Sequence, residues 1–390
     1  MRVPEHRALR VLHCPWNVAG QSATLAAAER ERGFDSRCIV LRETGHGFPA
    51  DESLTRPNDN LITIEVARYR LLWRALVWAD VVHFSFGQSC LVPNAFPGLS
   101  GLSFLRPWRW PLRLYSRLVW LKDLPLLRAA GKAIFVTWQG DDARQGDRSR
   151  ELFEICIANE IDELYYPAGS DSWKRRTIAC FGRYADGQYA LNPDLLRVLP
   201  KGASFLPYAS FDPEGVPCYP LDPAGLQPLR IIHAPSHRGA KGTKHILIAV
   251  ERLRAAGFRF DFEVIEGLPR DIALKRYATA DIVIDQLLAG WYGGLGVEAM
   301  ALGKVLVSYI REDDLRELPA GMASALPVVN ATPTNIEGVL RELIRMPRVR
   351  LAELGARGHA FVNQWHQPSS VAQRTTADYS EALERRRSQH

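Results

Sequence analysis

Residues 281–310 read DIVIDQLLAGWYGGLGVEAMALGKVLVSYI, and the fold can be inferred outward from them. The two ends of this stretch, Asp281–Asp285 and Val305–Ile310, are short runs rich in β-branched residues, which favour strands. Between them lies a run of good helix formers bounded by glycines, at positions 293, 294, 296 and 303. The pattern predicts a strand, a glycine-rich loop, a helix over 297–302 and a second strand, as in α/β proteins.

A glycine-rich loop that leads into a helix is suited to binding a phosphate group. Glycines let the backbone approach a ligand closely, and the first helical turn offers unpaired N–H groups and a partial positive charge. Gly293 and Gly294 lie in this loop, and Glu298 is expected in the first helical turn, where its carboxylate can accept two hydrogen bonds from a ribose diol. The structural alternative is a tight loop between buried elements, with Glu298 as a charge that suits a helix N-terminus.

Length and composition limit the class of protein. The 390 residues exceed one ordinary hydrophobic core, so two domains are expected. Lys and Arg number 49 against 43 Asp and Glu, a mild excess that suits anionic ligands without selecting one. The basic residues are dispersed and form no known nucleic-acid-binding motif, so no nucleic-acid partner is predicted. With six scattered cysteines, no signal-peptide pattern and no apolar run of about 18 residues, a cytoplasmic protein is expected.

The first half of the chain alternates strand and helix patterns. Leu9–His13 is an apolar strand pattern, Gly20 belongs to the turn that follows, and residues 21–32 are typical of a helix. The strand predicted at Lys132–Trp138 runs into the polar cluster QGDDAR at 139–144. Further strands are predicted at Leu61–Ile64, Asp80–Phe84, Asp162–Pro167 and Gly187–Leu191. The alternation predicts a mostly parallel, doubly wound sheet, and such sheets bind ligands at the carboxyl ends of their strands.

The second half repeats this alternation after a linker. Phe211–Pro228 contains several prolines and glycines without periodicity, which is typical of a segment between domains. The predicted division is a Rossmann-like domain at 1–210, a second at 211–366, and a C-terminal helix at 367–390. Four residues share one side of that helix, namely Val371, Thr375, Tyr379 and Leu383.

A basic stretch, IIHAPSHRGAKGTK at 231–244, begins the second series. A strand ends here, and a turn delivers Arg238, Lys241 and Lys244 near the start of a helix that Thr243 can cap. Cations beside a helix N-terminus form an anion site, and fixed cations stabilise a diphosphate that leaves a sugar. The alternative is a solvated basic loop, but three cations near the same glycine loop favour a functional site.

Several of these stretches resemble the GT-B glycosyltransferases, and more narrowly the retaining enzymes of glycosyltransferase family 4 that build cell-surface polysaccharides. The likeness runs over most of the chain, and the order of the motifs carries it more than any single one. The stretches concerned are NVAGQSATLAAAERERGF, AIFVTWQGDDAR, ALNPDLLRVLP with FLPYAS, HRGAKGT, and GWYGGLGVEAMALGKVLV.

This resemblance implies the fold and the reaction. The fold would be two doubly wound Rossmann-like domains on either side of a cleft, with the C-terminal helix packing back on the N-terminal domain. The N-terminal domain would bind a saccharide or lipid-linked acceptor, and the C-terminal domain a UDP- or GDP-linked sugar, with retention at the anomeric carbon and neither a metal nor another cofactor. Closure of the cleft would exclude water.

The resemblance also implies roles for individual residues. Arg238 and Lys241 would hold the diphosphate, Glu298 the donor ribose, and the backbone N–H groups of Gly293 and Gly294 would point towards the donor. The donor-binding set further includes Lys244 and Gly20.

Two positions depart from the family pattern. Relatives commonly carry Glu-x7-Glu ending at the position of Glu298, but the first position is Gly290 here, and Asp285 is a candidate to supply the missing contact with a sugar hydroxyl. Gln139 stands where relatives often have His, and a glutamine cannot exchange a proton near neutral pH. Asp142, with its neighbour Asp141, is the nearest acidic candidate for acceptor contacts, and capping of the following helix is the alternative for one of the two.

The stretch SFLRPWRWPLRLYSRLVWLK at 103–122 combines basic, aromatic and apolar residues. This composition is typical of a helix in a membrane interface, which would place the protein at the inner face of a membrane. An amphipathic helix that covers the first sheet, with its arginines in water, is an equal alternative.

Two competing functions remain open from the sequence. The fold could bind a nucleotide sugar or a partner protein without turnover, with Gly290 and Gln139 as signs of lost activity, and product formation would discriminate. A sugar-nucleotide epimerase would work without any acceptor.

Overall fold

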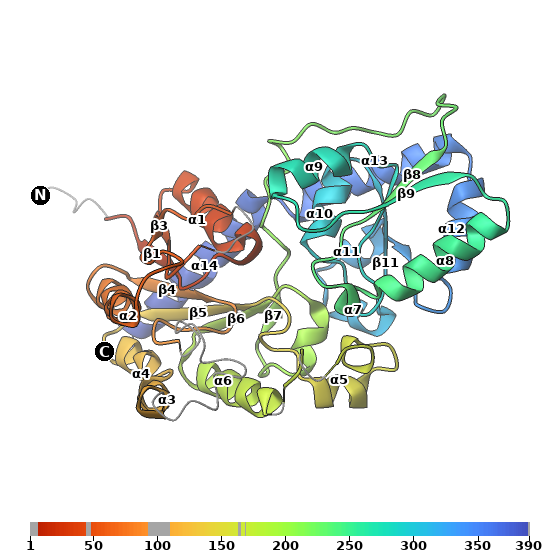
Figure 1. The fold of residues 1–390 in the computed structure, drawn as a ribbon. Coiled ribbons are helices and arrows are strands. Elements are labelled where there is room, and N and C mark those ends of the chain that lie inside the picture. The colour runs from red at the N-terminus through yellow and green to blue at the C-terminus, as the bar shows by residue number, and fades with distance from the viewer. Residues whose placement is uncertain (1–6, 44–47, 93–109, 163–164, 168, 389–390) are drawn as a thin grey trace, which may run out of the picture.

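The computed structural model describes residues 7–43, 48–92, 110–162, 165–167 and 169–388. Two parallel sheets, each wrapped by helices, follow one another along the chain (Figure 1). The first has seven strands in the order β3-β2-β1-β4-β5-β6-β7, and the second has five in the order β12-β11-β10-β8-β9. Both orders place early strands in the middle, as in a doubly wound sheet, so the predicted fold class is confirmed.

Both faces of the first sheet are apolar, because parallel strands are covered by helices on each side. Val11 and Val81 pack on the side of α1 and of the last helix, α14 (Pro368–Arg387). Leu12 and Val82, their neighbours in sequence, pack on the side of α2, α4 and α6. The strands are β1 Arg10–Cys14, β2 Asp35–Val40, β3 Glu52–Ser53, β4 Val81–Ser85, β5 Ala133–Trp138, β6 Gly187–Ala190 and β7 Ser204–Phe205. The helices are α1 Gln21–Glu31, α2 Leu61–Val77, α3 Trp110–Val119, α4 Asp123–Ala129, α5 Gly146–Leu152 and α6 Ser170–Tyr184, with short 3₁₀ turns η1 Val18–Gly20, η5 Ile157–Asn159 and η6 Pro193–Arg197.

The second sheet is built in the same way. Ile231 and Ile282 pack on one side with α8 and α12, while Ile232 and Val283 pack on the other with α10 and α13. Its strands are β8 Leu229–His233, β9 Phe260–Val264, β10 Ile282–Ile284, β11 Val305–Ser308 and β12 Val329–Asn330. Its helices are α7 Arg238–Lys241, α8 Thr243–Ala255, α9 Arg270–Ala278, α10 Gly294–Ala301, α11 Met322–Ala325, α12 Ile336–Arg345 and α13 Arg348–Trp365, with the 3₁₀ turn η7 Glu312–Glu317.

The last helix, α14 Pro368–Arg387, returns to the first sheet and packs against α1 (Figure 1). Val371, Thr375 and Tyr379 are buried on the side that the sequence predicts. The predicted return of the C-terminal helix is therefore confirmed. The domain limits at 210/211 and 366/367 stay predictions.

Two predicted strands are wrong. Leu61–Ile64 is the first turn of α2, because the Asn60 side chain accepts a hydrogen bond from the Thr63 N–H at 2.9 Å and so begins the helix at Leu61. The described part of Asp162–Pro167 is irregular. Within the described ranges, no helix is both long and apolar enough to cross a membrane.

Candidate active site

Three residues that the sequence selects meet at the carboxyl ends of β8 and β10. Lys241 Nζ lies 2.9 Å from Asp285 Oδ1 and donates to Gln286 Oε1 at 2.7 Å. Asp285 is fully buried, and its Oδ2 accepts the Gly293 N–H at 2.5 Å. Lys241 lies on α7, Asp285 follows β10 and Gly293 precedes α10, so the fold brings three separate segments to one point.

At the N-terminus of α10, Gly294 has free space beside it, whereas Gly293 is in contact with neighbouring side chains. A Cβ added to Gly294 would meet nothing within 4 Å, whereas one added to Gly293 would lie 3.4 Å from both Asp285 Oδ2 and Lys241 Nζ. The Gly293 N–H is bound by Asp285 and does not point into open space. Its expected direct contact with a donor is thus not seen in this arrangement, and the contact of Gly294 stays a prediction.

The other two predicted cations lie close to Lys241 in the chain, Arg238 on α7 and Lys244 in the first turn of α8. Arg238 donates to the Glu266 carboxylate at 2.9 and 2.5 Å, and Lys244 forms an ion pair with Glu160. A cavity of about 170 Å³ lies between them, lined by Glu160, Arg238, Gly239, Thr243, Lys244 and Leu247. The turn that the sequence predicts for Arg238 and Lys241 is a one-turn helix, α7.

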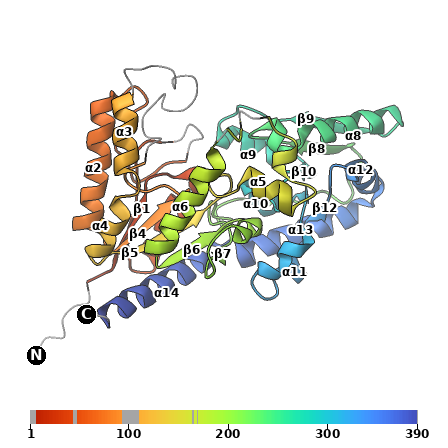
Figure 2. The ribbon, with the colours of Figure 1, turned by 90° about the horizontal axis from the view of Figure 1, so that it is seen from below.

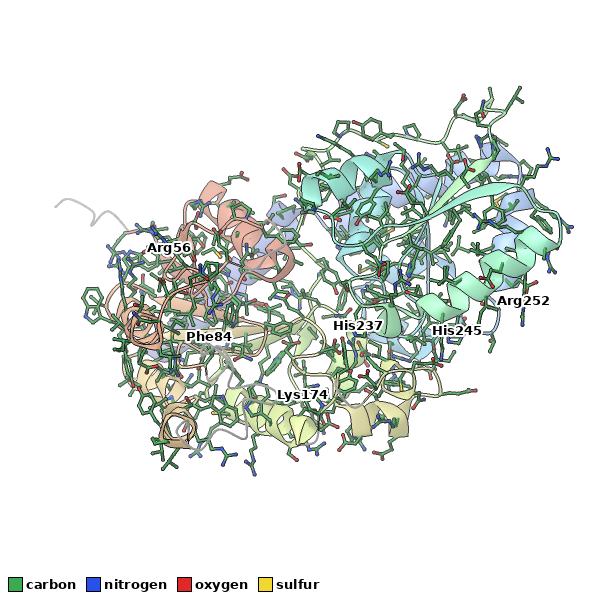
Figure 3. The ribbon with its side chains drawn as sticks, viewed as in Figure 1. Arg56, Phe84, Lys174, His237, His245 and Arg252 are labelled. Atoms are coloured by element: carbon green, nitrogen blue, oxygen red, sulfur yellow. The ribbon has the colours of Figure 1, made fainter. Side chains whose placement is uncertain are left out.

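Residues between β5 and β6 of the first sheet contact the segment that carries the predicted cations. The Tyr165 and His237 rings lie 4.9 Å apart, and His245 Nε2 lies 3.3 Å from Glu160 Oε2. His237 and His245 both lie on the side of the second sheet that is towards the first (Figure 3). The site is therefore shared between the two halves of the chain.

Glu298 lies in the second turn of α10, not the first, since the helix begins at Gly294. Its carboxylate accepts a hydrogen bond from Arg270 Nε at 3.0 Å, and burial raises the pKa of this carboxyl against the opposing effect of Arg270. The Arg270 guanidinium lies 4.8 Å from the centre of the Phe48 ring and 5.4 Å from that of Phe211. Arg270 could not be selected from sequence alone, because its partners Glu298, Phe48 and Phe211 come from three distant segments.

Gly20 approaches the same cluster from the first domain. It has a φ of 80°, and a Cβ added there would lie 2.7 Å from the Phe48 ring. Gly20 and Glu298 are thus linked through Phe48 and Arg270. Glycine is required at this position for both reasons.

Asp142 is turned into its own loop. Its carboxylate accepts the N–H groups of Gln139 and Gly140 at 3.0 and 2.7 Å, and burial raises the pKa of this carboxyl to about 6. The contact of Asp142 with an acceptor therefore stays a prediction. Asp142 does not cap the following helix, because α5 begins after Gln145 without a side-chain cap. Asp141 accepts hydrogen bonds from the Tyr165 and Tyr166 hydroxyls, and Gln139 Nε2 donates to Ser85 Oγ at 2.8 Å.

The departure at Gly290 has a structural basis. Gly290 has a φ of 78°, and a Cβ added there would lie 2.5 to 2.9 Å from the Arg311 guanidinium atoms. Arg311 is buried, stacks at 3.6 Å on the Phe153 ring, and donates to Asp314 at 3.0 Å and to the Ile155 carbonyl at 3.1 Å. A basic side chain, held by both halves of the chain, thus occupies the space that a larger residue at 290 would need.

We expect Gly290→Ala to lower the free energy of unfolding by about 2–4 kcal/mol, since about 1–2 kcal/mol comes from the positive φ and the rest from displacing Arg311. Denaturant unfolding measures the change. Gly267→Ala is a matched control, because Gly267 has a φ of 67° and open space around a Cβ. Equal losses in the two variants would contradict the role of Arg311.

The fold is that of known glycosyltransferases, although no family model and no curated protein matches the sequence. HepE of Anabaena, solved in complex with UDP-glucose, superposes with a TM-score of 0.57 and 12% identity, covering 96% of this chain and 99% of that one. Sucrose-phosphate synthase of Thermosynechococcus elongatus gives 0.56 and 13%, covering 97% and 100%. WaaG, a glycosyltransferase involved in lipopolysaccharide biosynthesis, gives 0.51 and 13%, covering 93% and 98%. The chain thus has the GT-B fold that the sequence predicts.

Proposed function

We propose that this protein is a glycosyltransferase that moves a sugar from a nucleotide sugar to a saccharide or lipid-linked saccharide, in the synthesis of a surface polysaccharide or glycoconjugate. The observation that carries the proposal is the convergence of Lys241, Asp285 and Gly293 at the carboxyl ends of β8 and β10, with Arg238 on the same helix as Lys241 and Lys244 in the first turn of α8. Ligands of open parallel sheets bind at such strand ends.

The donor diphosphate would bind among these cations. Each of them has a carboxylate partner, namely Glu266 for Arg238, Asp285 for Lys241 and Glu160 for Lys244. The first and last pairs are at the surface, where ion pairs contribute little, so a diphosphate can replace the carboxylates at small cost. The cations would then stabilise the charge that develops on the departing phosphate oxygens. Neither a metal nor another cofactor is part of the proposal.

Glu298 would bind the donor ribose from the other end of the site. Its partner Arg270 already fixes the orientation of the carboxylate, which leaves the second carboxylate oxygen as an acceptor for a ribose hydroxyl. Asp285 would orient Lys241 rather than contact a sugar hydroxyl, because both of its oxygens are engaged by Lys241 and Gly293. Retention at the anomeric carbon follows from the family resemblance alone and belongs to the proposal.

The acceptor would bind to the first domain, on the side of the Gln139–Asp142 loop. A lipid-linked acceptor would bring this otherwise cytoplasmic protein to the inner face of a membrane. The stretch 103–122 would make that contact, and its residues 103–109 lie outside the described ranges.

The first test is a thermal-shift screen of UDP, GDP and their common sugar conjugates. A ligand that binds only the folded protein raises the melting temperature by mass action. We expect one nucleotide family to raise it at millimolar concentration, and Glu298→Ala to lose the shift. Glu342→Ala, on the exposed side of α12, is the control that should keep it.

The screen also separates the proposal from its alternative. If no nucleotide shifts the wild type, the donor site is wrongly assigned. If a nucleotide sugar binds and neither transfer nor hydrolysis follows with any acceptor offered, the protein is a binding module with the same fold.

A further inference from the structure

The outer side of α2 exposes a row of large apolar side chains. Ile62, Val66, Tyr69, Trp73 and Val77 follow one another at spacings of three or four residues, which places them along one side of the helix. Ile62 is 76% exposed and Trp73 is 61% exposed. The opposite side of the same helix, with Leu71 fully buried, packs on the first sheet in the ordinary way.

Helix α3 extends this surface. Leu114 and Leu118, one turn apart on α3, are each 62% exposed. The Tyr69 and Tyr115 hydroxyls lie 2.6 Å apart, so the two helices are direct neighbours, and they lie side by side at the end of the first domain (Figure 2). Soluble proteins rarely leave large contiguous apolar patches uncovered, and those that remain usually mark a binding surface. We call the exposed residues of these two helices the α2–α3 surface.

Among the described residues of α2, α3 and α4, the exposed charges are basic. Among the residues of α2, α3 and α4, the acidic ones are Glu65, which accepts hydrogen bonds from Arg68 and Tyr115, and Asp123, which is fully buried. These exposed charges include Arg70 and Arg117, with Lys122 just before α4, and Arg70 lies 3.6 Å from Glu52 of β3. The α2–α3 surface is thus apolar in the middle and cationic at its edges.

We infer that the α2–α3 surface docks on a lipid bilayer that contains anionic lipids, with α2 rather than residues 103–122 as the principal contact. Interfacial helices bind a membrane in this way: their apolar side chains enter the headgroup region, and flanking cations contact the anionic lipids. Each Lys or Arg near an anionic leaflet contributes favourably to binding. A second copy of this chain fits less well, because a two-fold contact would bring the same cations together.

The inference rests on the proposed function in one respect, since an enzyme with a lipid-linked acceptor has a use for such a surface. The surface belongs to the first domain, which is the domain proposed to bind the acceptor. Its test uses neither donor nor acceptor, so a failure of the docking surface and a failure of the sugar transfer are distinguishable.

The experiment is co-sedimentation of the full chain with vesicles at low salt. Three samples are compared: vesicles of phosphatidylcholine with phosphatidylglycerol, vesicles of phosphatidylcholine alone, and no vesicles. We expect clear binding to the anionic vesicles, binding weaker by about tenfold or more to the neutral ones, and partial release by added salt. The double variant Val66→Ser, Trp73→Ser should weaken binding to the anionic vesicles by at least about tenfold.

The controls keep the result interpretable. Leu226→Ser removes an apolar side chain that is 97% exposed outside this surface and should leave vesicle binding unchanged. Arg70→Gln and Arg117→Gln, which keep the apolar row, should weaken binding to anionic vesicles only. The inference would be overturned if the protein bound neither kind of vesicle, or if the double variant bound the anionic vesicles as strongly as the wild type. It would also be overturned by a dimer in the sample without vesicles, measured by light scattering, that the double variant dissociates.

Discussion

Replacement of Lys241 by alanine is expected to lower kcat/KM for sugar transfer by about 10²–10³-fold, the range found when one fixed donor to a developing negative charge is removed. Lys241 is well placed for this role, because Asp285 and Gln286 hold its ammonium group at 2.9 and 2.7 Å. A preorganised cation needs no reorganisation when charge appears on the leaving diphosphate. The measurement is initial rate against donor concentration, with the donor that the thermal-shift screen selects.

Two further variants identify the cause of the loss. Lys275→Ala removes an exposed lysine from α9 and should leave kcat/KM unchanged. Lys241→Ala also leaves the Asp285 carboxylate buried without its cation, and this uncompensated charge contributes to the loss of kcat/KM. Combining Lys241→Ala with Asp285→Asn removes that uncompensated charge. Recovery of full activity in the double variant would contradict a direct role of Lys241 in catalysis.

Much of the fold follows from local pattern. Strands such as Ala133–Trp138 are buried on both faces, and a parallel sheet covered on both sides turns them into continuous apolar runs that are easily recognised. The prediction of a strand at Leu61–Ile64 is wrong because a short apolar run with β-branched residues fits a strand or a helix equally well. The cap at Asn60 decided between them, and such a cap was a readable signal.

The site was accessible to sequence reasoning only in part. Lys241, Asp285 and Gly293 could be selected because each lies at the end of a recognisable element and carries a residue type with a known use. Arg270 and Arg311 could not be selected, because their roles depend on tertiary contacts between distant parts of the chain. Arg270 contacts Phe48 and Phe211. Arg311 contacts Phe153 and Asp314. The direction in which the Asp142 carboxylate points is likewise a property of the folded loop.

The second large effect concerns Glu29, a fully buried carboxylate beneath the C-terminal helix. One of its oxygens lies 2.8 Å from His13 Nε2 and accepts the Ser36 hydroxyl at 2.7 Å. The other accepts the hydroxyls of Tyr379 and Thr375 at 3.1 and 3.3 Å. Four donors from β1, β2 and α14 thus converge on one side chain of α1.

We expect Glu29→Ala to lower the free energy of unfolding by about 3–5 kcal/mol, as for the removal of one partner from a buried charged network. The variant leaves the Tyr379 and Thr375 hydroxyls without their shared acceptor, so α14 should detach before the rest of the chain unfolds. Amide hydrogen exchange resolved along the chain measures this order, and denaturant unfolding measures the total loss.

Glu31→Ala is the matched control, because Glu31 lies on the same helix with its side chain exposed. Its effect should stay within about 0.5 kcal/mol. If Glu29→Ala destabilises the protein while protection in α14 is unchanged, Glu29 stabilises the first sheet and does not secure the helix. If α14 alone loses protection, the return of the C-terminal helix depends on this carboxylate, and the contact between the two ends of the chain is a polar network rather than apolar packing alone.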